Sequence, residues 1–204
     1  MLSNNQIAFW SGAQDYTKTN DGFDVTTLTS AWREILAACN SVTITSVLEL
    51  GANIGRNIQA LNVEIPTANL FACDVNDLAL ETLRARVPSA KTFHSSILDL
   101  PSDNTFDLVF TSGVLIHIHP DDLTENLQKV YRLSNRFVIL IEYFSQNLET
   151  VRYRNRDDLL WKRDFGALFM ENFDVEPLRQ GFLWSKTFGQ AGFDDCTYWV
   201  FRKN

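Results

Sequence analysis

The sequence predicts an α/β fold in which strands and helices alternate to build a doubly wound, mostly parallel sheet. Apolar runs of strand length occur at residues 47–50, 70–74, 106–111 and 137–142. Between them, apolar side chains recur at helical spacing. No repeat, low-complexity tract or long linker marks a second domain, and 204 residues with 45% hydrophobic content suit a single core. Such alternation is typical of parallel strands joined by crossover helices.

An N-terminal helical cap is expected to precede this core. The first 25 residues carry Trp10, Tyr16 and Phe23 among polar side chains. The segment that follows has one apolar helical face, formed by Leu28, Trp32, Ile35 and Leu36. We therefore expect one domain, 1–204, with residues 1–40 as a cap and lid and residues 41–204 as the core.

The other helices and the last strands follow in chain order. Pro88 ends one helix, and Pro120 begins another that has two acids in its first turn. The apolar helical faces are formed by Ile54, Ile58 and Leu61; by Leu80, Leu83 and Val87; by Leu123, Leu127, Val130 and Tyr131; and by Trp161, Phe165, Leu168 and Phe169. Residues 196–202 predict a final strand, which we expect to form a hairpin with residues near Gly181.

A glycine-bearing turn joins the first strand to its helix in the segment VLELGANIGRN, residues 47–57. Gly51 ends the strand, and Gly55 precedes the apolar stripe of the helix. Such turns let a ligand approach the backbone and leave N–H groups free at a helix N-terminus. Nucleotide-type cofactors bind there in doubly wound folds. The segment therefore predicts a cofactor site.

Two acids at strand ends indicate which nucleotide binds. A dinucleotide turn has glycine at the position of Asn53, and Glu49 would repel a pyrophosphate. Glu49 suits a cationic ligand such as S-adenosylmethionine, which carries an ammonium and a sulfonium. Asp74 ends the next strand about 20 residues farther on, where a carboxylate binds ribose hydroxyls. The alternative is that the glycines only close the turn and that Asp74 caps a helix starting near Asn76.

Over nearly its whole length the chain resembles the class I S-adenosylmethionine-dependent methyltransferases. Four segments occur in the order of that family: ELGANIG, ACDVNDLAL, SSILDLP and NTFDLVFTSGVLIHIHPDDL. Four tracts look like the methyltransferases associated with pseudaminic acid biosynthesis: FWSGAQDYTKTN, FTSGVLIHIHPDDL, RFVILIEYF and YRNRDDLLWKRDFGALF. The resemblance implies a Rossmann-like, seven-stranded sheet with an antiparallel C-terminal edge hairpin. It also implies an insertion on the side of the methyl acceptor near residues 145–170.

The resemblance implies specific contacts with S-adenosylmethionine. Gly51 and Gly55 would shape the turn, Glu49 would face the methionine end, and Asp74 would bind the ribose. Val75 would lie under the adenine, and Ile97 would offer it a backbone N–H. The other predicted cofactor residues are Trp10, Tyr16 and Asn20 in the cap, Asn53 in the turn, Ser96 near the adenine, and Thr111 and Ser112 at a strand end.

Two of these residues depart from the family pattern. Ser96 stands where an acid often binds the adenine amino group. Asn53 replaces a small residue, so its side chain either bonds the cofactor or tolerates a left-handed turn. For the cap aromatics Trp10 and Tyr16, the alternative is ordinary packing of an N-terminal arm.

Methyl transfer from a sulfonium needs little more than placement, because the methyl group is already activated. A base helps only some methyl acceptors, such as a sugar hydroxyl. Candidate groups at the strand ends are His117, His119, Glu142 and Tyr143. For His117 we favour a structural or cofactor-pocket role, because a histidine is common at that position across the class. His119 and Glu142 are then the expected groups beside the methyl acceptor.

A basic tract, residues 152–165, suggests how the methyl acceptor is recognised. Tyr153, Arg154, Lys162 and Arg163 are its predicted substrate-binding residues, since guanidinium groups pair with carboxylates and phosphates. If the subgroup resemblance holds, the anion is a nonulosonic acid or a nucleotide-linked precursor. The alternative is a solvated helix face whose charges are balanced by neighbouring acids.

Composition limits the remaining possibilities. A net charge of −7 argues against nucleic acid as a partner. No run approaches the ~18 apolar residues of a membrane span, and the polar start is no signal peptide. Cys39, Cys73 and Cys196 lack metal-ligand spacing, so we expect no metal and reduced thiols in a cytoplasmic protein. The oligomeric state is left open.

The sequence thus predicts an S-adenosylmethionine-dependent methyltransferase for a small, anionic metabolite related to surface sugars. The alternative enzyme is an O- or N-methyltransferase of another small acid or specialised metabolite. A second alternative is a module that binds S-adenosylmethionine without turnover. The strand-end acids and the ionisable groups beside the expected substrate space speak against that module.

Overall fold

A computed structural model describes residues 4–13, 21–39, 42–101 and 103–204. The predicted cofactor contacts of Tyr16 and Asn20 lie outside these residues. Within them, no helix is long and apolar enough to cross a membrane. The three cysteines are free and buried.

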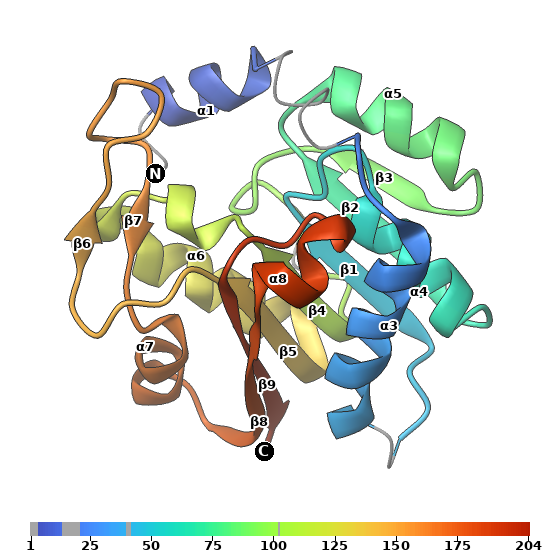
Figure 1. Ribbon diagram of the computed structural model, residues 1–204. Helices are drawn as coiled ribbons and strands as arrows, with labels where there is room; N and C mark the ends of the chain where they lie inside the picture. Colours follow the sequence, from blue (N-terminus) through green and yellow to red (C-terminus); the bar gives the residue numbers. More distant parts are fainter. Residues whose placement is uncertain (1–3, 14–20, 40–41, 102) are drawn as a thin grey trace.

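The central sheet has seven strands in the described part of the chain, in the order β3-β2-β1-β4-β5-β9-β8 (Figure 1). The strands are β1 (Ser46–Leu50), β2 (Asn69–Asp74), β3 (Lys91–His94), β4 (Phe106–Ser112), β5 (Ser134–Glu142), β8 (Val175–Leu183) and β9 (Cys196–Lys203). The first five in the spatial order are parallel, whereas β9 runs antiparallel to both β5 and β8. The chain therefore proceeds outward from β1 and then returns to β4, which makes the predicted doubly wound sheet with an antiparallel edge hairpin.

Helices cover both faces of the sheet. One face packs against α3 (Val25–Leu36), α4 (Arg56–Glu64) and α5 (Asp77–Arg86). The other packs against α6 (Pro120–Leu133) and α7 (Phe165–Asn172). Successive apolar residues of β2 and β5 alternate between the two cores. The shorter elements are α1 (Asn4–Ser11), η1 (Ala37–Cys39), η2 (Leu115–His117), β6 (Glu149–Thr150), β7 (Trp161–Lys162), α8 (Ser185–Phe188) and η3 (Gly189–Ala191).

The helix starts follow from their capping residues. The Asp24 side chain accepts the backbone N–H of Thr27, and the Asn76 side chain accepts that of Ala79. Pro120 occupies the first turn of α6, as predicted. Each cap satisfies an N–H that the first helical turn leaves without a partner.

The helix predicted from Trp161 onward begins later, at Phe165, so that prediction was wrong for its first turn. Trp161 and Lys162 form β7, which pairs with β6 through Trp161 and Thr150. The Asp164 side chain accepts the backbone N–H of Ala167 and sets the start of α7. Trp161 is buried although it lies in a strand. Its spacing of four residues from Phe165 is the same as on a helical face, which led to the wrong prediction.

Candidate functional site

A cavity of about 320 Å³ opens at the carboxyl ends of the parallel strands. Its walls come from the ends of β1, β2, β4 and β5, from α1, and from the segment just before β9. The cavity spans the point between β1 and β4 where the strand order reverses. Ligands bind at this place in open α/β sheets.

The glycine turn after β1 has three residues with positive φ. These are Gly51 at 71°, Asn53 at 49° and Gly55 at 76°. A Cβ on Gly51 would lie 2.5 Å from a methyl of Val114, and one on Gly55 would lie 2.4 Å from Leu83. Both glycines are therefore required for close packing as well as for backbone conformation.

Asn53 adopts the left-handed conformation that its type tolerates. Its side-chain Oδ1 accepts the next backbone N–H, that of Ile54, at 2.7 Å. Asn53 also lines the cavity.

Asp74 links the glycine turn to the end of β2. Its Oδ2 accepts the backbone N–H of Asn53 at 2.7 Å, and its Oδ1 accepts that of Asn76 at 2.8 Å. Burial raises the pKa of Asp74, and these two bonds act in the opposite direction. A carboxylate has about four lone-pair sites, so Asp74 retains capacity to accept from a ligand hydroxyl in the cavity. The helix cap is Asn76, not Asp74.

Glu49 is almost fully buried at the base of the cavity. Its Oε1 accepts the Asn57 side-chain amide at 2.7 Å, and Asn57 in turn accepts the indole N–H of Trp32 at 3.1 Å. Its Oε2 has no hydrogen-bond partner among the described residues. Burial raises the pKa of Glu49 to about 8. An unpartnered carboxylate oxygen fits the ammonium of an amino-acid group, which would supply both a charge and a donor.

The side of the cavity predicted to hold the adenine is lined by Val75, Ser96 and Ile97. The Ser96 hydroxyl donates to Asp99 at 2.6 Å, whereas Asp99 itself does not line the cavity. At the end of β4, Ser112 reaches the cavity and Thr111 does not. Thr111 is fully buried, and its hydroxyl lowers the pKa of the nearby Glu142. The structure therefore gives no support to the cofactor contact predicted for Thr111.

Helix α1 lies at the top of Figure 1 and is attached to the rest of the chain on both sides. The Asn76 side chain donates to the backbone carbonyl of Trp10 at 3.2 Å. On the other side, the Gln6 side chain donates to the carbonyl of Asp158 at 3.1 Å. Ile7 and Trp10 face the cavity. The described part of the cap thus covers the predicted cofactor site.

His117 lines the cavity between two aromatic rings. Its ring centre lies 4.3 Å from that of Trp10 and 5.7 Å from that of Tyr153. Its Nδ1 lies 2.6 Å from the Leu159 carbonyl oxygen, which can only accept, so Nδ1 carries the proton. Burial lowers the pKa of His117 to about 4, which keeps the imidazole neutral. This arrangement agrees with the predicted pocket role.

Glu142 does not reach the cavity, contrary to the prediction that it lies beside the methyl acceptor. It is fully buried and accepts the backbone N–H groups of Val114, Leu115 and Ile116 at 3.1 to 3.3 Å. Burial raises its pKa to about 7. Glu142 therefore holds the loop after β4 in place.

His119 is also outside the cavity, so the second prediction for a group beside the methyl acceptor was wrong. Its side chain accepts the backbone N–H of Asp121 and caps α6. Its ring packs edge-on against Trp161 at 5.3 Å. The His119 side chain therefore points toward the start of α6 and not into the cavity.

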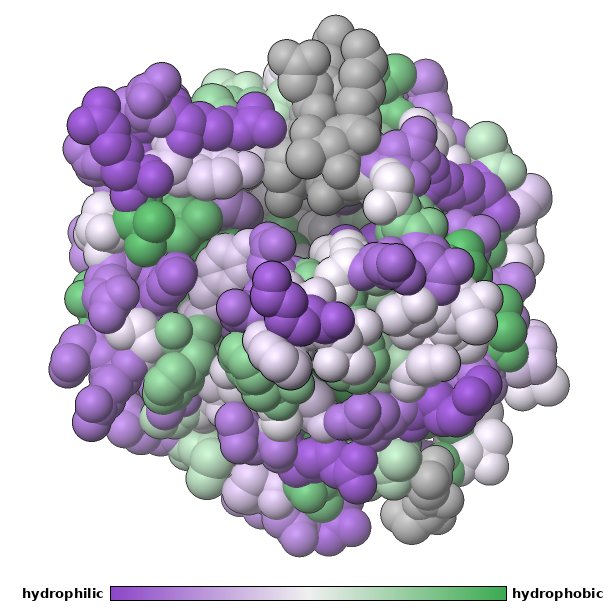
Figure 2. All heavy atoms as spheres, viewed as in Figure 1, coloured by the Kyte–Doolittle hydropathy of each residue, from purple (hydrophilic) through white to green (hydrophobic). Residues whose placement is uncertain are grey.

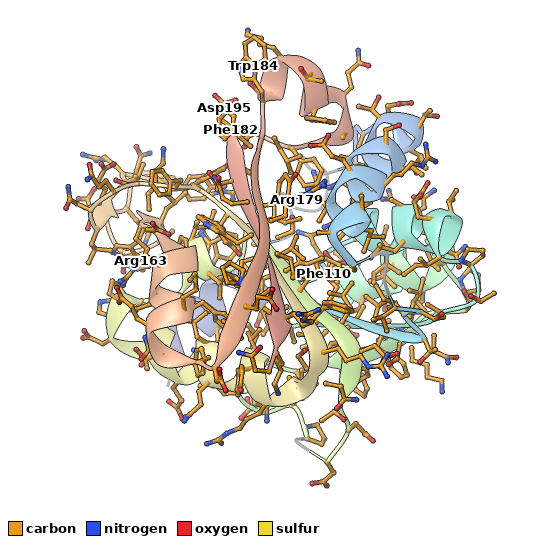
Figure 3. All side chains as sticks on the ribbon, turned by 90° about the horizontal axis from the view of Figure 1, so that it is seen from below. Phe110, Arg163, Arg179, Phe182, Trp184 and Asp195 are labelled. Carbon is orange, nitrogen blue, oxygen red and sulfur yellow. The ribbon has the colours of Figure 1, made fainter. Side chains whose placement is uncertain are left out.

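Of the four predicted substrate-binding residues, only Tyr153 lines the cavity. Arg154 is exposed and has a φ of 51° in the turn between β6 and β7. Figure 2 shows hydrophilic side chains gathered over this loop, at the upper left. Lys162 lies 5.4 Å above the Tyr143 ring, and Arg163 lies beside α7 (Figure 3). Lys162 and Arg163 are half-buried, and Arg163 Nε has no hydrogen-bond partner among the described residues.

The structure adds cavity residues that the sequence reasoning missed. They include Ile7, Arg56, Asn57, Ile118 and Asp194. Arg56 and Asn57 were visible as polar residues directly after the glycine turn. Asp194 precedes the last strand, and only the antiparallel direction of that strand brings it to this edge. The described residues contain no group of three or more His, Cys, Asp or Glu side chains that could hold a metal ion.

Comparison with known families gives one sequence match. Residues 47–136 match a family described as a methyltransferase domain, over less than half of the chain. No curated protein is similar enough in sequence to count as a relative.

Solved structures with similar folds cover nearly the whole chain. One is 1,6-didemethyltoxoflavin-N1-methyltransferase from Burkholderia thailandensis, with bound 1,6-didemethyltoxoflavin and S-adenosylhomocysteine. It is 15% identical with a TM-score of 0.70, over 98% of this chain and 86% of that one. Another is the N-methyltransferase NodS from Bradyrhizobium japonicum WM9, in complex with S-adenosylhomocysteine. It is 12% identical with a TM-score of 0.68, over 100% of this chain and 99% of that one.

A third similar structure is magnesium protoporphyrin IX methyltransferase from Synechocystis PCC 6803 with bound S-adenosylmethionine. It is 12% identical with a TM-score of 0.65, over 96% of this chain and 88% of that one. The chain therefore has the class I, Rossmann-like methyltransferase fold predicted from its sequence.

Proposed function

We propose that this protein is an S-adenosylmethionine-dependent methyltransferase that acts on a small molecule. The observation that carries the proposal is that two strand-end acids, Glu49 and Asp74, line the same cavity. Glu49 keeps one buried oxygen without a partner, and Asp74 keeps free lone pairs. A zwitterionic amino-acid group and a ribose, joined in one ligand, match these two groups.

The residues divide between the parts of the cosubstrate. Asp74 would bind the ribose hydroxyls, and Glu49 would bind the ammonium. Val75 and Ile97 supply an apolar place for the adenine. When bound, S-adenosylmethionine supplies a methyl group that is already activated for transfer.

The chain itself orients the substrates and excludes water. Helix α1 covers the cavity through Trp10, which contacts both Asn76 and His117. His117 is neutral, so it adds no positive charge beside a sulfonium. Holding two reactants in line supplies much of the acceleration for such a transfer.

The unit that performs this reaction is one domain spanning residues 1–204. The predicted cap of residues 1–40 is corrected in one respect: α1 lines the cavity, whereas α3 packs against the sheet as part of the core. The predicted insertion near 145–170 contributes Tyr153 to the cavity lining. The proposal of a single unit rests on the sheet, in which β8 and β9 join the same core as β1.

The chemical class of the methyl acceptor is open to experiment. The predicted nonulosonic acid would need cations in the cavity, but Arg154, Lys162 and Arg163 lie outside it. Arg56 is the basic side chain that lines the cavity within the described residues. The similar folds belong to proteins named for chemically different small substrates.

The test is incubation of the purified protein with S-adenosylmethionine labelled in the methyl group. The panel of candidate substrates contains acidic sugars, amino sugars, their nucleotide forms and heterocyclic small molecules. We expect one class to gain a single labelled methyl group by mass analysis. The Glu49→Gln variant, which should bind the cosubstrate more weakly, is the control. Tight cosubstrate binding without transfer to any class would favour the non-catalytic binding module instead.

A further inference from the structure

A carboxylate and a phenol meet at the end of the cavity that lies farthest from Asp74 along the sheet. The Tyr143 hydroxyl donates to Asp194 Oδ2 at 2.6 Å, and both residues line the cavity. Tyr143 follows β5, and Asp194 comes two residues before β9. Because β9 runs antiparallel to β5, its beginning lies at the same edge as the end of β5.

The segment that carries Asp194 is held in place by Arg56. The Arg56 guanidinium donates to the Gly192 carbonyl and lies 5.1 Å from the centre of the Phe193 ring. Gly192 has a φ of 79°, and a Cβ there would collide with the guanidinium. Arg56 begins α4, directly after the glycine turn. The position of Asp194 is therefore fixed relative to the turn that would hold the cosubstrate.

One oxygen of Asp194 remains available. Tyr143 binds Oδ2, and Oδ1 has no partner among the described residues. The hydrogen bond to Tyr143 restrains the Asp194 side chain through Oδ2 and leaves Oδ1 for a ligand. Asp194 is exposed at the cavity rim. A carboxylate oxygen accepts hydrogen bonds, so Oδ1 can accept one from a ligand in the cavity.

The spatial order of the strands separates the two ends of the cavity. Asp74 lies at the end of β2 and Glu49 near the end of β1. Beyond them come β4, then β5 with Tyr143, and then β9 with Asp194. A cosubstrate that spans the first two strand ends directs its reactive end toward β4 and β5. The second substrate must enter from that side.

We propose that Asp194 is the catalytic residue that binds the nucleophile of the methyl acceptor and receives its proton, and that Tyr143 positions Asp194. The inference rests on the proposed function. The substrate is accordingly an O–H or N–H compound, and the methylated atom is not a carboxylate oxygen.

The step balances in atoms and charge. The nucleophilic oxygen or nitrogen forms a bond to the methyl carbon, and the electron pair of the broken S–C bond stays on sulfur. The proton on the nucleophile passes to Asp194 Oδ1 and then to solvent, to which Asp194 is exposed.

The test uses two ligands that need no knowledge of the natural substrate. Sinefungin carries an amine on carbon where S-adenosylmethionine carries its sulfonium methyl, whereas S-adenosylhomocysteine carries nothing there. A carboxylate facing the transferred methyl should bind that amine by a charge-assisted hydrogen bond. We therefore expect the wild-type protein to prefer sinefungin to S-adenosylhomocysteine, as measured by calorimetry.

The Asp194→Asn variant should lose about tenfold or more of this preference, while its affinity for S-adenosylhomocysteine stays unchanged. Asp194→Glu should restore part of the preference. Tyr143→Phe should reduce it less, because the carboxylate remains but is no longer held. The matched control is Asp195→Asn, because Asp195 accepts from Ser185 and lies beside Phe182 and Trp184, away from the cavity lining (Figure 3).

The other outcomes contradict the proposal in distinct ways. An unchanged preference in Asp194→Asn, with normal thermal unfolding, means that Asp194 does not face the transferred methyl. Equal losses for both ligands would assign Asp194 to cosubstrate binding or to the fold. If the wild-type protein binds neither ligand, the proposed function fails and the role of Asp194 fails with it.

Discussion

The carboxylate of Asp74 accepts the backbone N–H of Asn53 at 2.7 Å, which joins the end of β2 to the glycine turn after β1. The same side chain accepts the N–H of Asn76, whose amide holds Trp10 of the cap. One carboxylate therefore connects the turn, the second strand and the lid. We therefore expect a ligand contact at Asp74 to affect the positions of the glycine turn and of helix α1 as well.

Replacing Asp74 by Ala should weaken binding of S-adenosylmethionine by on the order of 2 kcal/mol, since ribose hydroxyls lose a charged acceptor. It should also lower the melting temperature, because two backbone N–H groups lose their partner. Calorimetry and thermal unfolding measure the two effects. The control is Asp77→Ala, which alters an exposed acid in the first turn of α5 outside the cavity. Unchanged affinity in a folded Asp74→Ala variant would remove Asp74 from the cosubstrate site.

Glu49 should release a proton when the cosubstrate binds. Its pKa is raised to about 8 by burial, so most molecules carry the proton on Glu49 at pH 7. A bound ammonium favours the ionised form and lowers that pKa. Affinity should therefore rise with pH between about 6 and 8. Calorimetry in buffers of different ionisation enthalpy counts the proton, and Glu49→Gln should show none. Proton-independent binding to the wild-type protein would mean that Glu49 does not meet the ammonium.

Glu142 should prove to be a structural residue. Replacing it by Ala leaves three backbone N–H groups without their acceptor, which should cost at least about 3 kcal/mol of folding free energy. For a domain of this size that corresponds to roughly 6 to 12 °C in melting temperature. Glu142→Gln retains one carbonyl oxygen and should lose less. If Glu142→Ala unfolds at the wild-type temperature but transfers no methyl group, the catalytic role predicted from the sequence regains support.

Helix α1 should become protected from hydrogen exchange when the cavity is filled. The helix is attached mainly through Trp10 and Gln6, and two of its side chains face the cavity. Bound ligand would add contacts to Ile7 and Trp10, so local opening should become rarer. Exchange measured by mass spectrometry, with and without S-adenosylhomocysteine, tests this for residues 4–11. Equal protection in both states would make the helix a permanent part of the core.

The sequence predicted those parts of the structure that depend on local pattern. Apolar runs and the glycine turn located β1, β2, β4 and β5, and parallel strands bring their carboxyl ends to one edge. Glu49 and Asp74 were found for that reason. His119 and Glu142 were misplaced because strand ends fix the edge on which a residue lies but not the direction of its side chain. Glu142 is covered by the loop after β4, a contact between segments more than 25 residues apart.

Asp194 could not be found from local pattern at all. It precedes a strand, and residues before parallel strands lie at the opposite edge of the sheet. Only the reversed direction of β9 brings Asp194 to the ligand edge. The prediction that a helix begins at Trp161 was wrong for a related reason. The conformation of Trp161 depends on its pairing with Thr150, which lies 11 residues earlier in the chain.

Calorimetric titration with S-adenosylmethionine, S-adenosylhomocysteine and NAD tests the central claim most directly. The strand-end acids Glu49 and Asp74 face one cavity, and NAD has no ammonium group that would pair with Glu49. We predict saturable binding of both adenosyl compounds, lost in a Glu49→Gln, Asp74→Ala double variant, and no binding of NAD. Tight binding of NAD without binding of either adenosyl compound would contradict the account.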